Sequence, residues 1–493
     1  MAVANQHPAA ESTRRAYNPS VLRQLALRVI LPMALVALLL FGLLAWETAR
    51  LLPPGSAGFV AAMWRMFCER GGDLTLTWRD VRAERNAPAL REKLPQDHPE
   101  LVNVNAFHPV ARIEWLRSDE EAAFRSLATI LDPKDYLNFK LTGERVSDPV
   151  SMARLAAAAR SGPSGRSLLD AIGVSLNVAP TLIEPTDMVG RVVASLPKPL
   201  DRLADKPVFC CSNDTWAAVV GLGALQPNYA YNISGTTEVF GVMSDEPASA
   251  DGLLRVDWRG LHQLGGPGQN GADTVPWLLA LLGHRDGMPV SGAIDELLSA
   301  KRDPQPLLFL PYLQGERTPY WDSSLRGAFI GLNRNHKGVD LAWAVLEGVA
   351  FLNRIVLERA EASLGRAATE IRFGGGASVN PIWRQIKADI CERPVVTGAS
   401  PQPGALGAAA VAWTGLGRFA SLVEAQRKLV RIAHRHEPDQ RRAAVYRPLY
   451  DLYRQSEVAL APTLRSLAAM ARNSSDLPGV HAAPSLQSKD RPL

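Results

Sequence analysis

The chain has 493 residues, of which 47% are hydrophobic and 21% charged, and a formal net charge of +5 at pH 7. This length suits two or three globular domains. The small positive excess forms no Lys/Arg block interleaved with aromatics, which argues against a nucleic-acid-binding protein. The four cysteines show neither metal-ligand spacing nor a disulfide framework, so we expect buried free thiols in a reducing compartment. These residues are Cys68, Cys210, Cys211 and Cys391.

An uncharged apolar segment runs from Val29 to Trp46, and its 18 residues reach the lower limit for crossing a bilayer. Arginines precede it, so the preferred interpretation is a membrane anchor with a cytoplasmic N-terminus, which would place the rest of the chain outside. A signal peptide is the first alternative, although no good cleavage site follows the segment. A buried core helix is the second, and the apolar faces all round argue against it.

After a linker at residues 51–58, the pattern predicts helices over 81–94 and 108–131, the second with a further start signal at Ser118. Residues 132–155 pass from a turn to a helix to a Gly-containing turn. A short buried strand at Lys206–Cys211 opens a new unit, which places a domain boundary near residue 205.

The second unit alternates strands and helices, which is typical of an α/β fold. Strands are predicted at 228–234, 237–243, 306–313, 370–378 and 394–398. Helices are predicted at 277–282, 338–365, 381–391 and 404–417. The helix at 338–365 is long and amphipathic. C-terminal helices are expected over 421–472, followed by a disordered tail over 473–493.

Three glycine-containing turns are candidates for ligand contact. Gly374–Ala377 lies between a strand and a helix, where a backbone without Cβ atoms can approach an anion. Gly235, Thr236 and Thr237 could offer N–H groups and hydroxyls to phosphate oxygens, although an ordinary hairpin is equally common. The match of Gly266–Gly271 to a dinucleotide-binding pattern, with Asp286 beyond it, lacks the surrounding βαβ unit and is rejected.

Asp214 precedes an alanine-rich helix and has two interpretations. It could cap that helix, or it could accept a proton from a substrate hydroxyl. Farther along, a segment dense in Gly, Pro and aromatics carries Glu316, Arg317, Asp322 and Arg326, which we expect to form a structural ion network joining loops.

Taken in order, these segments resemble the FGGY carbohydrate kinases of the xylulokinase type. The resemblance rests on "LPYLQGERTPYWD", "FGGGASVNPIWRQIKADICERPV", "GALGAAAVAWTGLGRF" and the stretch from Ser212 to Gly241, and it spans roughly Thr75 to Phe419. It implies an α/β fold of two actin-like (ribonuclease H-like) ATPase domains that close over a sugar and Mg-ATP.

The resemblance also implies roles for residues. Asp214 would be the general base on the sugar hydroxyl, and Trp78, Asp80 and Thr215 would lie near the sugar. The residues that would contact the nucleotide are Gly235, Thr236, Thr237, Gly271, Gly375, Gly376, Ala377 and Asn380.

The front of the chain departs from the family pattern. Family members begin with an Asp-x-Gly-Thr turn, whereas the first aspartate here is Asp73. We therefore expect residues 1–70 to be a non-family segment with a transmembrane helix and 71–205 to be an incomplete first domain. Residues 206–420 would form the second domain, 421–472 C-terminal helices, and 473–493 the tail.

The leading hypothesis is an ATP-dependent kinase acting on a sugar or polyol hydroxyl, with ATP and Mg²⁺ as cofactors. The alternative is a membrane-associated pseudokinase that binds sugar or nucleotide without turnover. The expected location is cytoplasmic, which conflicts with the outside location that the arginines before residues 29–46 would give the rest of the chain. Membrane association through residues 29–46 and a homodimer are further hypotheses.

Overall fold

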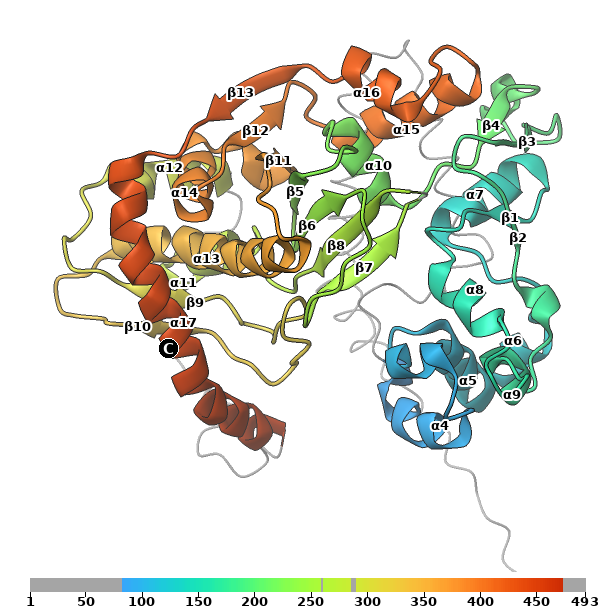
Figure 1. The fold of residues 1–493 in the computed structure, drawn as a ribbon, viewed down its shortest axis with the longest axis horizontal. Coiled ribbons are helices and arrows are strands. Elements are labelled where there is room, and N and C mark those ends of the chain that lie inside the picture. Colours follow the sequence, from blue (N-terminus) through green and yellow to red (C-terminus); the bar gives the residue numbers. More distant parts are fainter. Residues whose placement is uncertain (1–81, 259, 285–289, 473–493) are drawn as a thin grey trace, which may run out of the picture. The chain divides into compact units, whose positions relative to one another are not determined.

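The computed structural model describes residues 82–258, 260–284 and 290–472 (Figure 1). In this part of the chain no helix combines the length and the apolar character needed to cross a bilayer. The predicted apolar helix at 29–46, the predicted tail at 473–493 and Asp286 lie outside the described residues, as do Trp78, Asp80 and Cys68. The three other cysteines carry free thiols, as predicted; Cys210 and Cys391 are buried, and Cys211 is half-buried.

By its internal contacts the chain divides into two compact units. The described residues of the first are Lys140–Gly143 and Arg191–Lys206, where Val193 N donates to Leu141 O over 2.9 Å. The described residues of the second unit are 82–139, 144–190, 207–258, 260–284 and 290–472. The boundary at residue 205 stays a prediction.

The first part of the chain is mainly helical, with two short sheets. The predicted helix over 108–131 is two helices, α5 (Pro109–Asp119) and α6 (Glu121–Arg125), because the backbone leaves the helical region at Glu120. The other helices are η2 (Arg82–Arg85), α4 (Ala87–Lys93), η3 (Pro99–Asn103), α7 (Pro133–Thr142), α8 (Ala153–Ala159), α9 (Leu168–Ala171), η4 (Leu176–Val178) and η5 (Leu200–Leu203). Strands β1 (Val146–Ser147) and β2 (Thr181–Leu182) pair in parallel, and β3 (Met188–Arg191) neighbours β4 (Pro207–Phe209).

The rest of the chain is organised on a seven-stranded mixed sheet with the order β13-β12-β11-β5-β6-β8-β7 (Figure 1). The predicted hairpin is confirmed: β5 and β6 pair antiparallel, and β11 pairs in parallel with β5 and with β12. The strands are β5 (Tyr229–Ser234), β6 (Glu238–Ser244), β7 (Leu254–Asp257), β8 (His262–Pro267), β11 (Glu370–Gly374), β12 (Val395–Gly398) and β13 (Ile432–His436).

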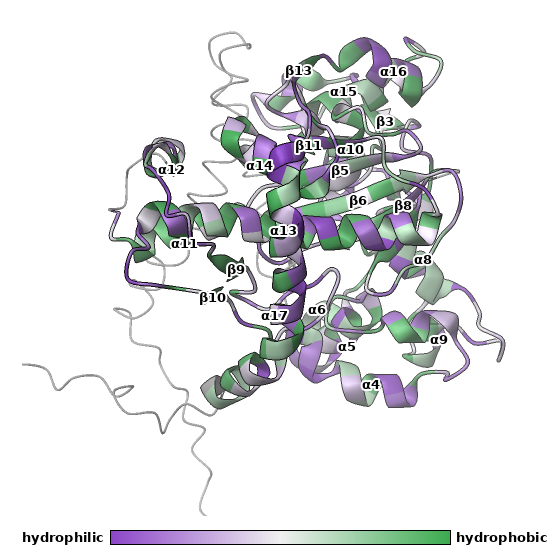
Figure 2. Ribbon diagram, turned by 60° about the vertical axis from the view of Figure 1, so that its left-hand side comes forward, coloured by the Kyte–Doolittle hydropathy of each residue, from purple (hydrophilic) through white to green (hydrophobic). Residues whose placement is uncertain are grey.

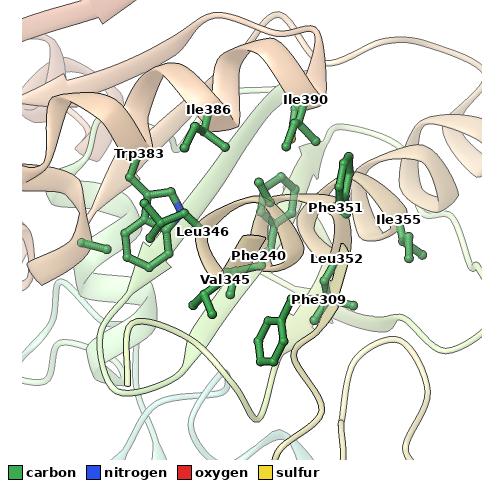
Figure 3. Packing of buried hydrophobic residues seen from close by; sticks show 14 of the residues in the cluster. Phe240, Phe309, Val345, Leu346, Phe351, Leu352, Ile355, Trp383, Ile386 and Ile390 are labelled. Carbon is green, nitrogen blue, oxygen red and sulfur yellow. The ribbon is translucent and has the colours of Figure 1, made fainter. Parts of the chain in front are cut away.

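One face of the sheet packs against the predicted long helix, observed as α13 (Gly338–Leu364), and against α14 (Pro381–Cys391). Figure 3 shows Phe240 of β6 among Phe351 and Leu346 of α13 and Trp383 of α14. In Figure 2 the purple bands on α13 are its polar residues, which alternate along the helix with the green bands of its apolar residues. The same cluster includes residues of α11 (Thr274–Leu281), α12 (Val290–Ser299), β9 (Leu308–Leu310) and α17 (Gln440–Arg472), with β10 (Ala328–Ile330) packed against it.

The opposite face packs against α10 (Asp214–Gly221), α15 (Pro403–Gly415) and α16 (Leu422–Leu429). Neighbouring residues of a strand point to opposite faces, so Phe240 and Val242 join the first core while Met243 joins the second. Helices α10 and α15 approach until their backbones touch: a Cβ on Gly407 would lie 1.8 Å from the Ala217 carbonyl oxygen.

Two helices, α16 and α17, occur in the range 421–472 where C-terminal helices are expected, but the strand β13 between them is not foreseen. It pairs antiparallel with β12 at the edge of the sheet, and four of its five residues are exposed. Edge strands carry charged side chains that discourage further pairing, and the Ile-Ala-His-Arg-His sequence therefore lacks the apolar pattern that marks an internal strand.

Gly407→Ala should destabilise the protein by about 1–3 kcal/mol or more, because the added methyl group would force α10 and α15 apart. The matched control is Gly404→Ala in the same helix, where a Cβ meets nothing within 4 Å. Removing that glycine should leave stability unchanged or raise it by up to about 1 kcal/mol. Urea unfolding of both variants measures the difference, and equal midpoints for Gly407→Ala and wild type would contradict the close contact.

Candidate active site

The turn between β5 and β6 consists of Gly235, Thr236 and Thr237, and its first two residues are exposed. Gly235 N donates to Thr237 O over 3.0 Å, which closes the turn. Gly375 follows β11 and lies against this turn, where a Cβ on it would be 2.3 Å from the Ser234 carbonyl oxygen. Its φ of 89° is also in the left-handed region, so glycine is required there on two grounds.

Gly271 lies against the last residue of the same turn. A Cβ on Gly271 would lie 2.5 Å from the Thr237 carbonyl carbon, and Ala272 N donates to Gly235 O over 3.0 Å. Three of the predicted nucleotide-binding segments, far apart in the sequence, therefore meet at one place. We call Gly235–Thr237, Gly271 and Gly375–Ala377 the glycine cradle.

The glycine cradle has an open side. Cβ atoms on Gly235 or Gly376 would meet nothing within 4 Å, while Ala377 is buried in a short 3₁₀ helix, η6 (Gly376–Val379). Asn380 caps α14, accepting from Trp383 N over 2.9 Å, and its amide donates to Asp295 over 2.7 Å. This arrangement leaves exposed backbone beside a helix start, which suits a phosphate-bearing ligand.

Asp214 is the first residue of α10 and is exposed. The interpretation of Asp214 as the helix cap is wrong by one residue, because Asn213 is the cap and accepts from Trp216 N over 2.9 Å. Asp214 Oδ1 accepts from Thr215 N at 2.7 Å, with the Thr215 hydroxyl 3.4 Å away. The carboxylate of Asp214 is thus not needed for the cap.

Asp214 begins α10, whereas the end of this helix is the part that approaches Gly374, the neighbour of the glycine cradle. Leu222, which follows the helix, packs at Gly374 beside the cradle, since a Cβ on Gly374 would be 2.7 Å from the Leu222 side chain. Eight helical residues span about 12 Å, so Asp214 stands about that far along the helix axis from this contact. Within the described part of the chain, both hydrogen bonds that the Asp214 carboxylate accepts come from Thr215.

A buried charge pair that sequence reasoning missed lies beneath the cradle. Glu238, the first residue of β6, accepts from the Ser234 hydroxyl over 2.6 Å and from the Asn232 amide, and Lys387 of α14 lies 3.4 Å away. Lys387 also donates to Asn353. Burial lowers the pKa of Lys387, and the Glu238 carboxylate opposes that shift. The pair ties both ends of the β5–β6 turn to α14.

A second buried carboxylate fixes the loop that leads to Gly271. Glu316 accepts from Gln269 N at 2.5 Å and Arg317 N at 2.9 Å, and from the Asn270 amide at 2.9 Å. Burial raises the pKa of Glu316 to about 7, while these hydrogen bonds work in the other direction. The loop from Gly268 to Gly271 is therefore held through its backbone.

The expected ion network of Glu316, Arg317, Asp322 and Arg326 is confirmed in one part, since the Arg317 charge acts on Glu316, and is wrong for the other two side chains. Asp322 pairs with Arg465 over 2.7 Å, and Arg326 donates to the carbonyl oxygens of its own loop. In a segment rich in Gly and Pro, charged side chains find free backbone groups nearby. Hydrogen bonds to these groups compete with ion pairs between the side chains.

One group of potential metal ligands occurs among the described residues, formed by Asp135, Asp148 and Cys210. The Lys134 ammonium group lies among them, paired with Asp135 and 2.9 Å from Asp148. The two carboxylates raise the pKa of Lys134 against the opposing effect of burial. A cation already occupies this group, so it does not fit a catalytic Mg²⁺.

Lys387→Met should cost about 3–5 kcal/mol of folding stability, because Glu238 would keep a buried charge without its partner. The double variant Lys387→Met/Glu238→Gln should recover more than half of that loss, since it removes both charges. Chemical denaturation of the two single variants and the double variant gives the coupling energy. Additive losses in the double variant would show that the two side chains do not interact.

Comparison with protein-family models gives two matches. A model of the N-terminal domain of the FGGY family of carbohydrate kinases matches residues 74–221, and one of the C-terminal domain matches residues 230–416. Together they cover more than half of the chain. The matched ranges contain Asp214 and the whole glycine cradle.

Known proteins agree with these matches. The chain is 29% identical to a xylulose kinase of Escherichia coli, over 79% of this chain and 81% of the relative. It is 27% identical to a xylulose kinase of Lactococcus lactis, over 77% of each chain. The crystal structure of xylulose kinase from Rhodospirillum rubrum superposes with a TM-score of 0.67 at 26% identity, over 79% of this chain and 80% of that one. The chain belongs to the FGGY family of carbohydrate kinases, and has its two-domain fold.

Proposed function

We propose that this protein transfers the γ-phosphoryl group of ATP to a hydroxyl group of a ketose or polyol. The observation that carries the proposal is the convergence of three glycine segments on the β5–β6 turn, in a chain of the FGGY family. Phosphoryl transfer depends mainly on positioning and electrostatic stabilisation, and a backbone cradle with an open side can bind the phosphates. The names of the relatives favour xylulose as the first acceptor to test.

Asp214 is assigned as the general base. Both of its intrahelical contacts end on Oδ1, which leaves Oδ2 for the proton of an acceptor hydroxyl. Thr215 orients the carboxylate through its N–H group and lies where it could also contact the acceptor. Positioned proton transfer of this kind contributes about 10²–10⁴-fold to a rate.

The proposed cofactors are ATP and Mg²⁺. Gly235, Thr236 and Thr237 would bind phosphate oxygens, while Gly375 packs against Ser234 and Gly271 against Thr237. Lys134 occupies the one group of three potential metal ligands found among the described residues, so no step is assigned to the metal. The pseudokinase alternative gains no support from the relatives, which are named as kinases. A cytoplasmic location and a homodimer stay predictions.

Asp214→Asn should lower kcat by about 10²–10⁴-fold, because the amide cannot accept the hydroxyl proton. ADP formation with xylulose, other pentuloses and glycerol measures the rate, and nucleotide titration should show unchanged ATP affinity. The matched control is Asp251→Asn, whose carboxylate is fully exposed and 3.9 Å from Arg359. No ADP above background with any acceptor, or equal rates for Asp214→Asn and wild type, would overturn the proposal.

A further inference from the structure

The loop Cys210–Asn213 joins β4 to α10 and delivers Asp214 to its place. Cys211 has φ of 57°, in the left-handed region that non-glycine residues rarely adopt. Such a residue costs about 1–3 kcal/mol and persists only where its surroundings enforce it. Contacts around this loop must therefore hold the Cys211 backbone in its left-handed conformation.

The loop backbone is held by an earlier part of the chain within the same compact unit. Cys210 N donates to Asp187 O over 3.0 Å, and Cys211 N donates to Pro185 O over 2.8 Å. The Asn138 amide donates to Cys210 O over 3.3 Å. These bonds fix the entry to the loop but not Ser212, which lies closer to Asp214.

Ser212 is held by a side chain. Ser212 lies two residues before Asp214. Its buried hydroxyl donates to Asp148 Oδ1 over 2.7 Å. The same Asp148 oxygen accepts from Val150 N at 2.9 Å and Ser151 N at 3.0 Å, so the carboxylate is itself immobilised. Asp148 thus connects the turn after β1 to the loop that carries Asp214.

Lys134 stabilises the charged form of the buried Asp148 carboxylate. Its ammonium lies 2.9 Å from Asp148 Oδ2 and 3.5 Å from Cys210 O, and it also pairs with Asp135. Although burial raises the pKa of Asp148, the Lys134 charge and the Ser151 hydrogen bonds bring it below the usual value. A charged acceptor makes a stronger hydrogen bond to Ser212 than a neutral one would.

We propose that Asp148, with Lys134 as its counterion, is a positioning residue that acts through Ser212 to fix the orientation of Asp214. This inference rests on the proposed role of Asp214 as general base. It predicts that weakening the Asp148–Ser212 bond lowers the rate of phosphoryl transfer without weakening nucleotide binding, because the glycine cradle is built from other segments.

The kinetic test uses Ser212→Ala and Asp148→Asn, with wild type and Glu121→Gln as controls. Glu121 makes an exposed ion pair with Arg125, and both residues belong to α6, not to this loop. We expect kcat to fall about 10-fold in Ser212→Ala and at least 30-fold in Asp148→Asn, with ATP affinity within twofold of wild type. Assays run well below each melting temperature keep a general loss of folding from mimicking the effect. Unchanged kcat in Ser212→Ala would overturn the proposal.

A second readout does not depend on turnover. Cys211 is half-buried and burial raises the pKa of its thiol, so alkylation by iodoacetamide should be slow in wild type. We expect peptide mapping to show at least 10-fold faster alkylation at Cys211 in Ser212→Ala and Asp148→Asn, and no change at Cys391. Equal rates would show that Asp148 does not hold the loop. If wild type phosphorylates no acceptor, the proposed function fails, while the alkylation rates still decide whether Asp148 fixes this loop.

Discussion

The arrangement of the site depends on one steric constraint, the contact between glycine backbones at the β5–β6 turn. Gly375 and Gly271 touch Ser234 and Thr237 so closely that any side chain would displace them. Three segments can converge only because two of them have no Cβ atom at the point of contact. The turn is consequently part of the sheet's own packing, and its exposed residues are presented from a rigid base, which favours preorganised binding.

Burying charge around this turn demands compensation, and the structure uses three different forms of it. Glu238 has a lysine partner and neighbouring polar side chains, whereas Glu316 depends on backbone N–H groups and one amide. Lys134 serves two aspartates at once. The outcome differs accordingly: burial dominates at Glu316, whose pKa rises to about 7, while at Asp148 the Lys134 charge and the Ser151 hydrogen bonds together outweigh burial, and the pKa falls. Each cluster joins segments that are distant in the sequence, so each adds specificity to the fold.

The sequence predicts the repeated local features better than the buried polar contacts. The hairpin of β5 and β6 and helix α13 follow from apolar periodicity, and both are confirmed. Strand β13 lacks that periodicity because it lies at an exposed edge.

Buried polar partners are harder to foresee, because a pattern of residue types does not say which charges meet. Lys387 reads as a surface lysine on an amphipathic helix, yet it is 1% exposed. Asn213 and Asp214 are equally good caps by type, and only the backbone geometry assigns the cap to Asn213. The glycine cradle was predictable as separate turns, whereas their contact required the fold.

The touching backbones of α10 and α15 have a mechanical consequence. Gly221 and Gly407 leave no room for side chains between the helices, and Gly415 brings the end of α15 against Phe209 of β4. Neither helix can slide or tilt alone without a collision of main-chain atoms. Together with β4 they form one rigid unit, and Asp214 lies at the start of α10 within it. A backbone motion of Asp214 toward a bound sugar would therefore move α10, α15 and β4 together.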